Sequence, residues 1–193
     1  MAITIAILSY LLGSIPTGYL LGLYAGVDVR KTGSGNIGAT NVARALGKMR
    51  GVLTLLADAA KGAVPVYIAT QLDLGEMSAA IVGAAAFLGH LFPVYLKFKG
   101  GKGVATAVGV LFALAPMAAL VLLVVFAAAL LICRMVSLSS IAAALAAPIA
   151  VWLFHYPLNY IVLAAFLSIM VVLRHRSNIQ RLLAGTEPRW SAR

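Results

Sequence analysis

Long apolar runs alternate with short polar segments along this chain. About 20 consecutive apolar residues cross a bilayer as a helix, and these Ala- and Leu-rich runs lack the alternation that strands require. The pattern therefore predicts an all-α polytopic membrane protein. The expected spans are residues 3–24, 51–71, 77–95, 104–115, 116–132, 138–154 and 158–173.

Composition agrees with this interpretation. Of the 193 residues, 63% are hydrophobic and 10% are charged, which is too little charge to cover a soluble domain. We expect one integral-membrane domain over residues 1–193. The net charge of +10 would favour nucleic acid in a soluble protein, but here the cations cluster between apolar runs, as in cytoplasmic loops. We therefore expect a lipid bilayer and no nucleic acid as the partner.

The run 104–132 decides the number of spans. If it is one helix, the C-terminal cations fall outside the cell. If it breaks at Pro116, 14 of the 15 Lys and Arg residues, all but Lys61, lie in the cytoplasm, as positively charged loops prefer. No Lys or Arg precedes Arg30, which argues against a signal peptide. We predict seven spans, with the N-terminus outside and the C-terminus cytoplasmic. Residues 104–115 would be a short helix of about 18 Å.

The first candidate site is a glycine–asparagine loop, residues 32–44. Its glycines permit positive φ, and successive N–H groups can then form an anion-binding nest beside fixed cations. The run from Gly33 to Gly38 matches a dinucleotide-binding pattern, but no strand precedes it, so that interpretation is rejected. The loop is predicted to bind phosphate through Ser34, Gly35, Asn36, Gly38, Thr40, Asn41 and Arg44.

The second candidate site is a lysine loop, residues 97–103, followed by an apolar helix. Lys102 brings a compact charge, and the N-terminus of a helix starting at residue 104 favours anions at the same place. The loop is not a Walker A motif, because Leu96 and Gly103 stand where Gly and Ser or Thr are needed. Its candidate phosphate ligands are Gly100, Gly101, Lys102, Gly103 and Thr106. The alternative is a glycine-rich turn between two spans.

A C-terminal basic segment, residues 174–193, places His175 and Asn178 at i, i+3 on an expected helix. Histidine titrates near neutral pH and can donate to a phosphate or carbonyl oxygen. The alternative is an anchor that only sets membrane topology.

Asp58 and Lys61 lie within an expected span, also at i, i+3. Ionisable residues at this depth usually face the protein interior. Two interpretations stay open: an ion pair that supports the structure, or contact of Lys61 with substrate. The scattered acids and histidines give no metal site, and the lone Cys133 excludes an internal disulfide.

These motifs together resemble the bacterial acyl-phosphate:glycerol-3-phosphate acyltransferases, the PlsY family. The resemblance rests on the segments 34–44, 89–106 and 174–179 in this order. It implies a bacterial inner-membrane enzyme whose site faces the cytoplasm. The enzyme would transfer a fatty acyl group from acyl phosphate to the 1-hydroxyl of glycerol 3-phosphate, the first acylation of phospholipid synthesis. We expect no cofactor, no metal and a monomer.

The resemblance implies that the lysine loop holds glycerol 3-phosphate. An acyl phosphate is already activated, so we expect direct attack by the glycerol hydroxyl, with Ser34 as a phosphate ligand rather than a nucleophile. The expected catalytic residues are Ser34, Arg44, Lys102, His175 and Asn178. The general base stays open between His175 and a substrate phosphate.

Two other functions are alternatives. A small anion transporter would handle phosphate with glycine-rich loops, but the chain has no convincing internal repeat, and its polar loops lie on one face rather than at the midplane. A scaffold that binds anionic lipids would need basic loops, but clustered glycine and asparagine would serve no purpose in it.

Overall fold

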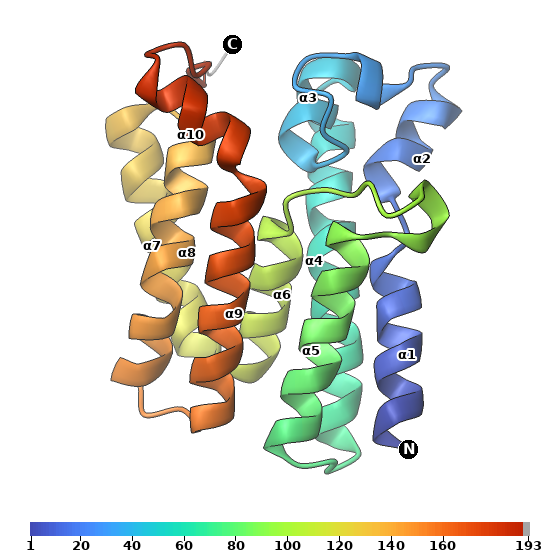
Figure 1. Ribbon diagram of the computed structural model, residues 1–193, viewed down its shortest axis with the longest axis vertical. Coiled ribbons are helices and arrows are strands. Elements are labelled where there is room, and N and C mark those ends of the chain that lie inside the picture. The colour runs from blue at the N-terminus through green and yellow to red at the C-terminus, as the bar shows by residue number, and fades with distance from the viewer. Residues whose placement is uncertain (191–193) are drawn as a thin grey trace. The chain divides into compact units, whose positions relative to one another are not determined.

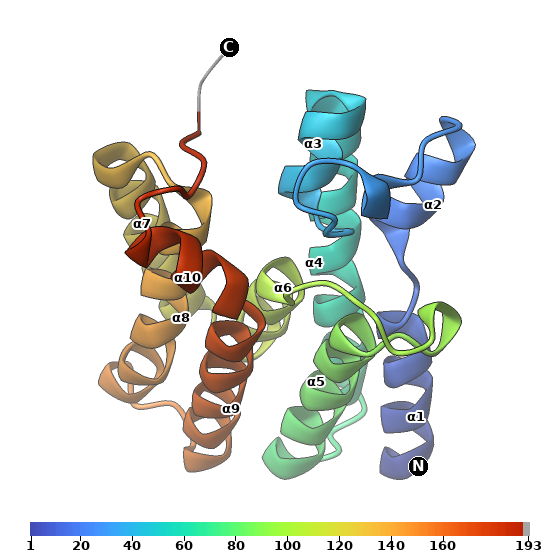
Figure 2. The same ribbon diagram turned by 45° about the horizontal axis from the view of Figure 1, so that its top comes forward.

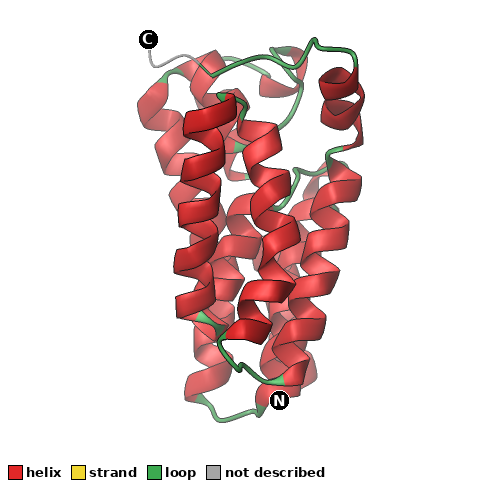
Figure 3. Cartoon of the chain, turned by 90° about the vertical axis from the view of Figure 1, so that its left-hand side faces the viewer, coloured by secondary structure: helices red, strands yellow, loops and turns green. Residues whose placement is uncertain are grey.

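The computed structural model describes residues 1–190, and all regular structure in this part is helical (Figures 1 and 3). Arg193, which is counted among the cations above, lies outside the described residues. The chain divides into two compact units, residues 1–114 and the described part of 115–193.

The first unit is built around one long helix, α4. This helix packs against α1, α5 and α6, and the short α3 precedes it directly. A break at residues 14–16, which contains Pro16, separates α1 from α2 within the expected first span. The helices are α1 (Ala2–Gly13), α2 (Thr17–Tyr24), α3 (Ala39–Leu46), α4 (Lys48–Gln71), α5 (Glu76–Leu91) and α6 (Val104–Leu114), with 3-10 turns η1 (Val29–Lys31) and η2 (Val94–Leu96).

Small residues allow these helices to approach closely. A Cβ atom on Gly109 of α6 would lie 2.0 Å from the carbonyl oxygen of Ala59 on α4. A Cβ on Gly13 of α1 would lie 2.1 Å from the carbonyl oxygen of Ala86 on α5. Glycine is therefore required at both helix contacts, as is common where membrane helices pack backbone to backbone.

The second unit consists of α7 (Pro116–Cys133), α8 (Val136–Leu153), α9 (Leu158–Arg174) and α10 (Arg176–Leu183), and α8 packs against both α7 and α9. Pro116 is the first residue of α7, where its missing N–H costs nothing. The predicted break at Pro116 is therefore confirmed: α6 ends at Leu114, and a separate helix follows.

The helices suit a lipid environment. Among the described residues, five helical segments are long and apolar enough to cross a membrane, and there are six if the pair α9–α10, bent by 59°, is counted as one span. Large apolar side chains such as Leu131 and Ile132 are 77% and 81% exposed. The 11-residue α6 is too short to cross alone, so the count of seven spans stays a prediction.

Candidate functional site

The segment that leads into the lysine loop packs on the apolar residues beneath the glycine–asparagine loop. Val29, Ile37 and Val42 form a buried apolar cluster beneath the glycine–asparagine loop, and Leu96 of η2 packs against that cluster. In Figure 2 the segment between α5 and α6, which contains the lysine loop, lies below α3 and near the C-terminal end of α1. The proximity of these two segments was expected only from topology, and the apolar contact through Leu96 supplies its physical cause.

Asn41 holds the glycine–asparagine loop in shape. Its side chain is buried, and its Nδ2 donates to three carbonyl oxygens, those of Val29 (2.8 Å), Thr32 (3.1 Å) and Asn36 (2.8 Å). Its Oδ1 accepts the N–H of Ser34 at 2.9 Å. The sequence-based expectation placed Asn41 among the phosphate ligands, whereas here both of its polar atoms bind backbone.

Several N–H groups of this loop are also engaged internally. The Gly35 N–H donates to the Thr32 carbonyl at 2.9 Å, and the Gly38 N–H donates to the Asn36 side chain at 2.8 Å. Fewer N–H groups of this loop are therefore available to bind an anion than the sequence suggested.

The side chains that this loop presents outward come from three of the predicted residues. Ser34, Thr40 and Arg44 are exposed. The Arg44 guanidinium makes no ion pair within the part of the chain that the structure describes. These groups are placed to meet an anion that arrives from outside the helical unit.

A neighbouring cation is already neutralised. The Arg30 guanidinium donates to the Asp28 carboxylate through Nε (2.9 Å) and Nη2 (2.8 Å), and it stacks 4.3 Å from the ring centre of Tyr19. Hydrogen bonding from Arg30 lowers the pKa of Asp28 to about 2. Asp28 and Tyr19 therefore hold the Arg30 guanidinium in place, and Arg44 is the better candidate for a residue that binds phosphate.

The lysine loop folds back onto the end of α5. The N–H groups of Gly100 and Gly101 donate to the carbonyl oxygens of Leu91 (3.2 Å) and His90 (3.1 Å), which a helix C-terminus leaves without intrahelical partners. These two N–H groups therefore cap a helix, whereas we expected them to bind phosphate. Lys102 follows directly and lies two residues before α6, half-buried.

Two predicted ligands lie inside the unit instead. Thr106 is 0% exposed, and a Cβ on Gly62 would lie 2.3 Å from its carbonyl oxygen, so it belongs to the contact between α4 and α6. Lys61 is 6% exposed, and its Nζ lies 2.9 Å from Asp58 Oδ1 and donates to the Ile15 carbonyl at 2.9 Å. Both positions favour structural roles over direct substrate contact.

In the second unit, Glu187 organises the C-terminal basic segment. Its carboxylate accepts hydrogen bonds from Ser137 (2.6 Å), Asn178 (2.7 Å) and Arg181 (2.8 Å). Burial raises the pKa of Glu187, but these three donors outweigh that effect, and the net shift is downward. Sequence reasoning missed Glu187; the available signal was that it stands alone as an acid among the cations of residues 174–193.

His175 lies at the junction of α9 and α10, and its side chain is 2% exposed. Its Nδ1 is 2.8 Å from the Val171 carbonyl oxygen. Since a carbonyl only accepts, Nδ1 carries the proton, and Nε2 is the ring nitrogen that can gain or lose one. The ring is thereby oriented by its own helix.

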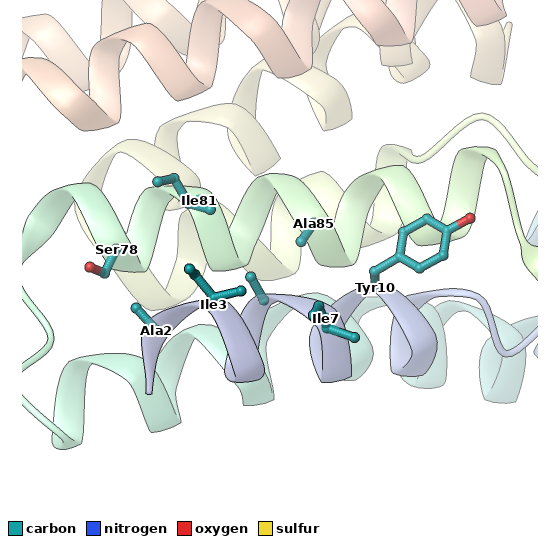
Figure 4. A pocket seen from close by; sticks show the side chains of 8 residues that line it. Ala2, Ile3, Ile7, Tyr10, Ser78, Ile81 and Ala85 are labelled. Carbon is teal, nitrogen blue, oxygen red and sulfur yellow. The ribbon is translucent and has the colours of Figure 1, made fainter.

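An apolar groove of the first unit lies apart from these residues. No cluster of three potential metal-binding side chains occurs in residues 1–190. A groove of about 400 Å³ between α1 and α5 is lined by residues such as Ile3, Ile7 and Ile81, and it is almost wholly apolar (Figure 4). Such a groove suits hydrocarbon rather than phosphate.

Comparison with known proteins decides the family. A sequence model of the glycerol-3-phosphate acyltransferases matches residues 3–185, which includes parts of both units. The chain belongs to the glycerol-3-phosphate acyltransferase family. A relative named glycerol-3-phosphate acyltransferase from Syntrophotalea carbinolica is 54% identical over 95% of each chain. One of the same name from Aquifex aeolicus is 45% identical over 98% of this chain and 99% of its own.

Solved structures give the same result for the family fold. The glycerol 3-phosphate form of PlsY, described as an integral membrane glycerol 3-phosphate acyltransferase, is 44% identical and has a TM-score of 0.95 over 98% of this chain and 96% of its own. The lysophosphatidic acid form of PlsY has a TM-score of 0.93 over 98% and 95% of the two chains. This glycerol-3-phosphate acyltransferase family member is therefore an all-helical, multi-pass integral membrane protein of the PlsY type, and the resemblance drawn from the sequence is confirmed.

Proposed function

We propose that this protein transfers a fatty acyl group from acyl phosphate to the 1-hydroxyl of glycerol 3-phosphate, with 1-acylglycerol 3-phosphate and phosphate as products. The observation that carries the proposal is the contact of Leu96, the residue before the lysine loop, with the apolar cluster beneath the glycine–asparagine loop. Ser34 and Arg44 are exposed on the glycine–asparagine loop, and Lys102 belongs to the lysine loop. Membership of the acyltransferase family and the glycerol 3-phosphate form of PlsY support it.

Each of the two loops would bind the phosphate group of one substrate. Lys102, next to the N-terminus of α6, would bind the phosphate of glycerol 3-phosphate, because a point charge and a helix dipole act there together. Ser34 and Arg44, exposed on the glycine–asparagine loop, would bind the phosphate of the donor. Thr40 would assist from the first turn of α3.

The chemistry would be a direct transfer. The glycerol oxygen attacks the acyl carbonyl, the bond from that carbon to the phosphate oxygen breaks, and phosphate leaves with the electron pair. The hydroxyl proton goes either to His175 Nε2 or to a phosphate oxygen. Positioning of two bound reactants supplies most of the rate gain in such a reaction, so neither a covalent intermediate nor a metal is needed. Asn178 would contribute together with His175.

We also propose that the protein lies in the bacterial cytoplasmic membrane as a monomer with seven spans. Its N-terminus would be outside, and the polar loops would face the cytoplasm, where both anionic substrates occur. The placement of positive charge supports this topology.

One donor comparison tests the function. Purified protein in lipid nanodiscs would receive glycerol 3-phosphate together with acyl phosphate or acyl-CoA, with EDTA present. We expect lysophosphatidic acid and phosphate to form with acyl phosphate as the donor and not with acyl-CoA. Transfer from acyl-CoA instead would overturn the donor assignment, and phosphate flux in proteoliposomes without any transfer would favour a transporter.

A further inference from the structure

A cluster of buried ionisable side chains lies beneath the two polar loops of the first unit. Asp58 Oδ1 is 2.9 Å from Lys61 Nζ and 3.6 Å from His90 Nδ1. All three side chains are at most 6% exposed. Charged groups at the depth of membrane spans are costly and are kept where they serve a function.

Lys61 connects this cluster to the broken first span. Its Nζ donates to the Ile15 carbonyl in the break between α1 and α2. Broken spans occur in membranes only where the exposed backbone groups find partners. Since α2 leads into the glycine–asparagine loop, Lys61 helps to fix the start of that segment.

His90 connects the cluster to the lysine loop. Its carbonyl accepts the Gly101 N–H at 3.1 Å. A Cβ built on Gly101 would lie 2.2 Å from His90 Nε2, so the imidazole lies against the backbone that directly precedes Lys102. The Nδ1 edge of this imidazole thus lies toward Asp58, and the Nε2 edge lies against the loop.

We propose that Asp58, Lys61 and His90 are positioning residues that fix the lysine loop, and with it Lys102, for binding of the acceptor's phosphate. The proposal rests on the function proposed above and extends it. The three residues act through the loop rather than by touching substrate. Replacing a buried ion pair by apolar residues often leaves stability unchanged, so stability alone does not account for a charged cluster connected to the loop.

A double-mutant cycle tests the contact between His90 and the loop. Gly101→Ala brings a Cβ onto the imidazole and should raise the KM for glycerol 3-phosphate by about tenfold or more, with a smaller effect on kcat, since a shift of about 1 Å in a positioning element is costly. His90→Ala removes the ring, so the double variant should bind glycerol 3-phosphate better than Gly101→Ala alone.

Gly100→Ala is the matched control. Its Cβ would lie 2.1 Å from the His90 carbonyl oxygen, a backbone atom that His90→Ala leaves in place. His90→Ala should therefore rescue Gly101→Ala and not Gly100→Ala. Equal effects of His90→Ala in both glycine backgrounds would overturn the proposal.

Amide hydrogen exchange does not depend on enzyme turnover, so it tests the positioning role separately from the proposed function. Asp58→Asn should speed amide hydrogen exchange in residues 97–103, while Asp73→Asn, an equal charge change at an exposed loop position, should not. Faster exchange in a protein that lacks transferase activity would refute the function and leave the positioning role intact. Unchanged exchange in folded Asp58→Asn would overturn the positioning role, even if wild-type protein is active.

Discussion

Replacement of Asn41 by alanine tests whether the shape of the glycine–asparagine loop underlies activity. Asn41 makes four hydrogen bonds to the backbone between Val29 and Asn36, and its side chain is buried. The variant loses these bonds and leaves three carbonyl oxygens and one N–H to find new partners.

The expected loss of kcat/KM follows from the number of hydrogen bonds that the Asn41 side chain makes. Two amide hydrogens serve three acceptors, so we count about three full bonds at about 1 kcal/mol each, net of solvation. A loss of about 3 kcal/mol in the ordered loop corresponds to roughly a 100-fold loss of kcat/KM. Asn41→Asp should be at least as damaging, because it places a carboxylate oxygen against three carbonyls.

The assay is lysophosphatidic acid formation from acyl phosphate and glycerol 3-phosphate, with both substrates varied. Asn159→Ala makes the same chemical change at a half-buried position in the first turn of α9, outside both polar loops, and should leave kcat/KM within about twofold. A change of less than about threefold in Asn41→Ala would refute the claim that this side chain organises the loop for the reaction.

Four further changes test individual roles. Lys102→Ala should raise the KM for glycerol 3-phosphate by roughly 10- to 100-fold, the worth of a charge-assisted hydrogen bond, and an unchanged KM would contradict its role. Ser34→Ala should lower kcat by about tenfold, and intact-mass analysis of wild-type protein with acyl phosphate should find no acyl adduct. His175→Ala should lower kcat by about 100-fold or more; full turnover would exclude His175 as both base and polariser. Glu187→Gln should lower the unfolding midpoint by about 2–4 °C at neutral pH. Because folding lowers the pKa of Glu187 below 4.5, the difference from wild type should be full above about pH 4.5 and vanish as the pH falls through the folded pKa.

The helices were largely predictable from the sequence, because hydrophobic length and proline placement are local properties. The break at Pro116 was expected and is present. The start of α9 at Leu158 was also expected, whereas the third expected span, residues 77–95, ends as a helix at Leu91. There the C-terminal carbonyls of α5 are capped by Gly100 and Gly101, a contact that the local sequence does not reveal.

The candidate site was predictable in its residue types and less so in its assignments. The glycines suggested N–H groups aimed at an anion, but Gly100 and Gly101 use theirs to cap α5. Asn41 and Lys61 looked like ligands because they are polar in an apolar chain, and the structure directs both toward backbone carbonyls. These partners are distant in sequence or out of helical register, so no pattern along the chain encodes them.

One isotope experiment tests the central claim most directly. Glycerol 3-phosphate labelled with ¹⁸O in its 1-hydroxyl is incubated with acyl phosphate and purified protein, and both products are analysed by mass spectrometry. Attack of the 1-hydroxyl on the acyl carbon predicts the label in the ester oxygen of lysophosphatidic acid and none in the released phosphate. Label-free lysophosphatidic acid, or labelled glycerol bisphosphate with free fatty acid, would contradict attack of the glycerol hydroxyl on the acyl carbon.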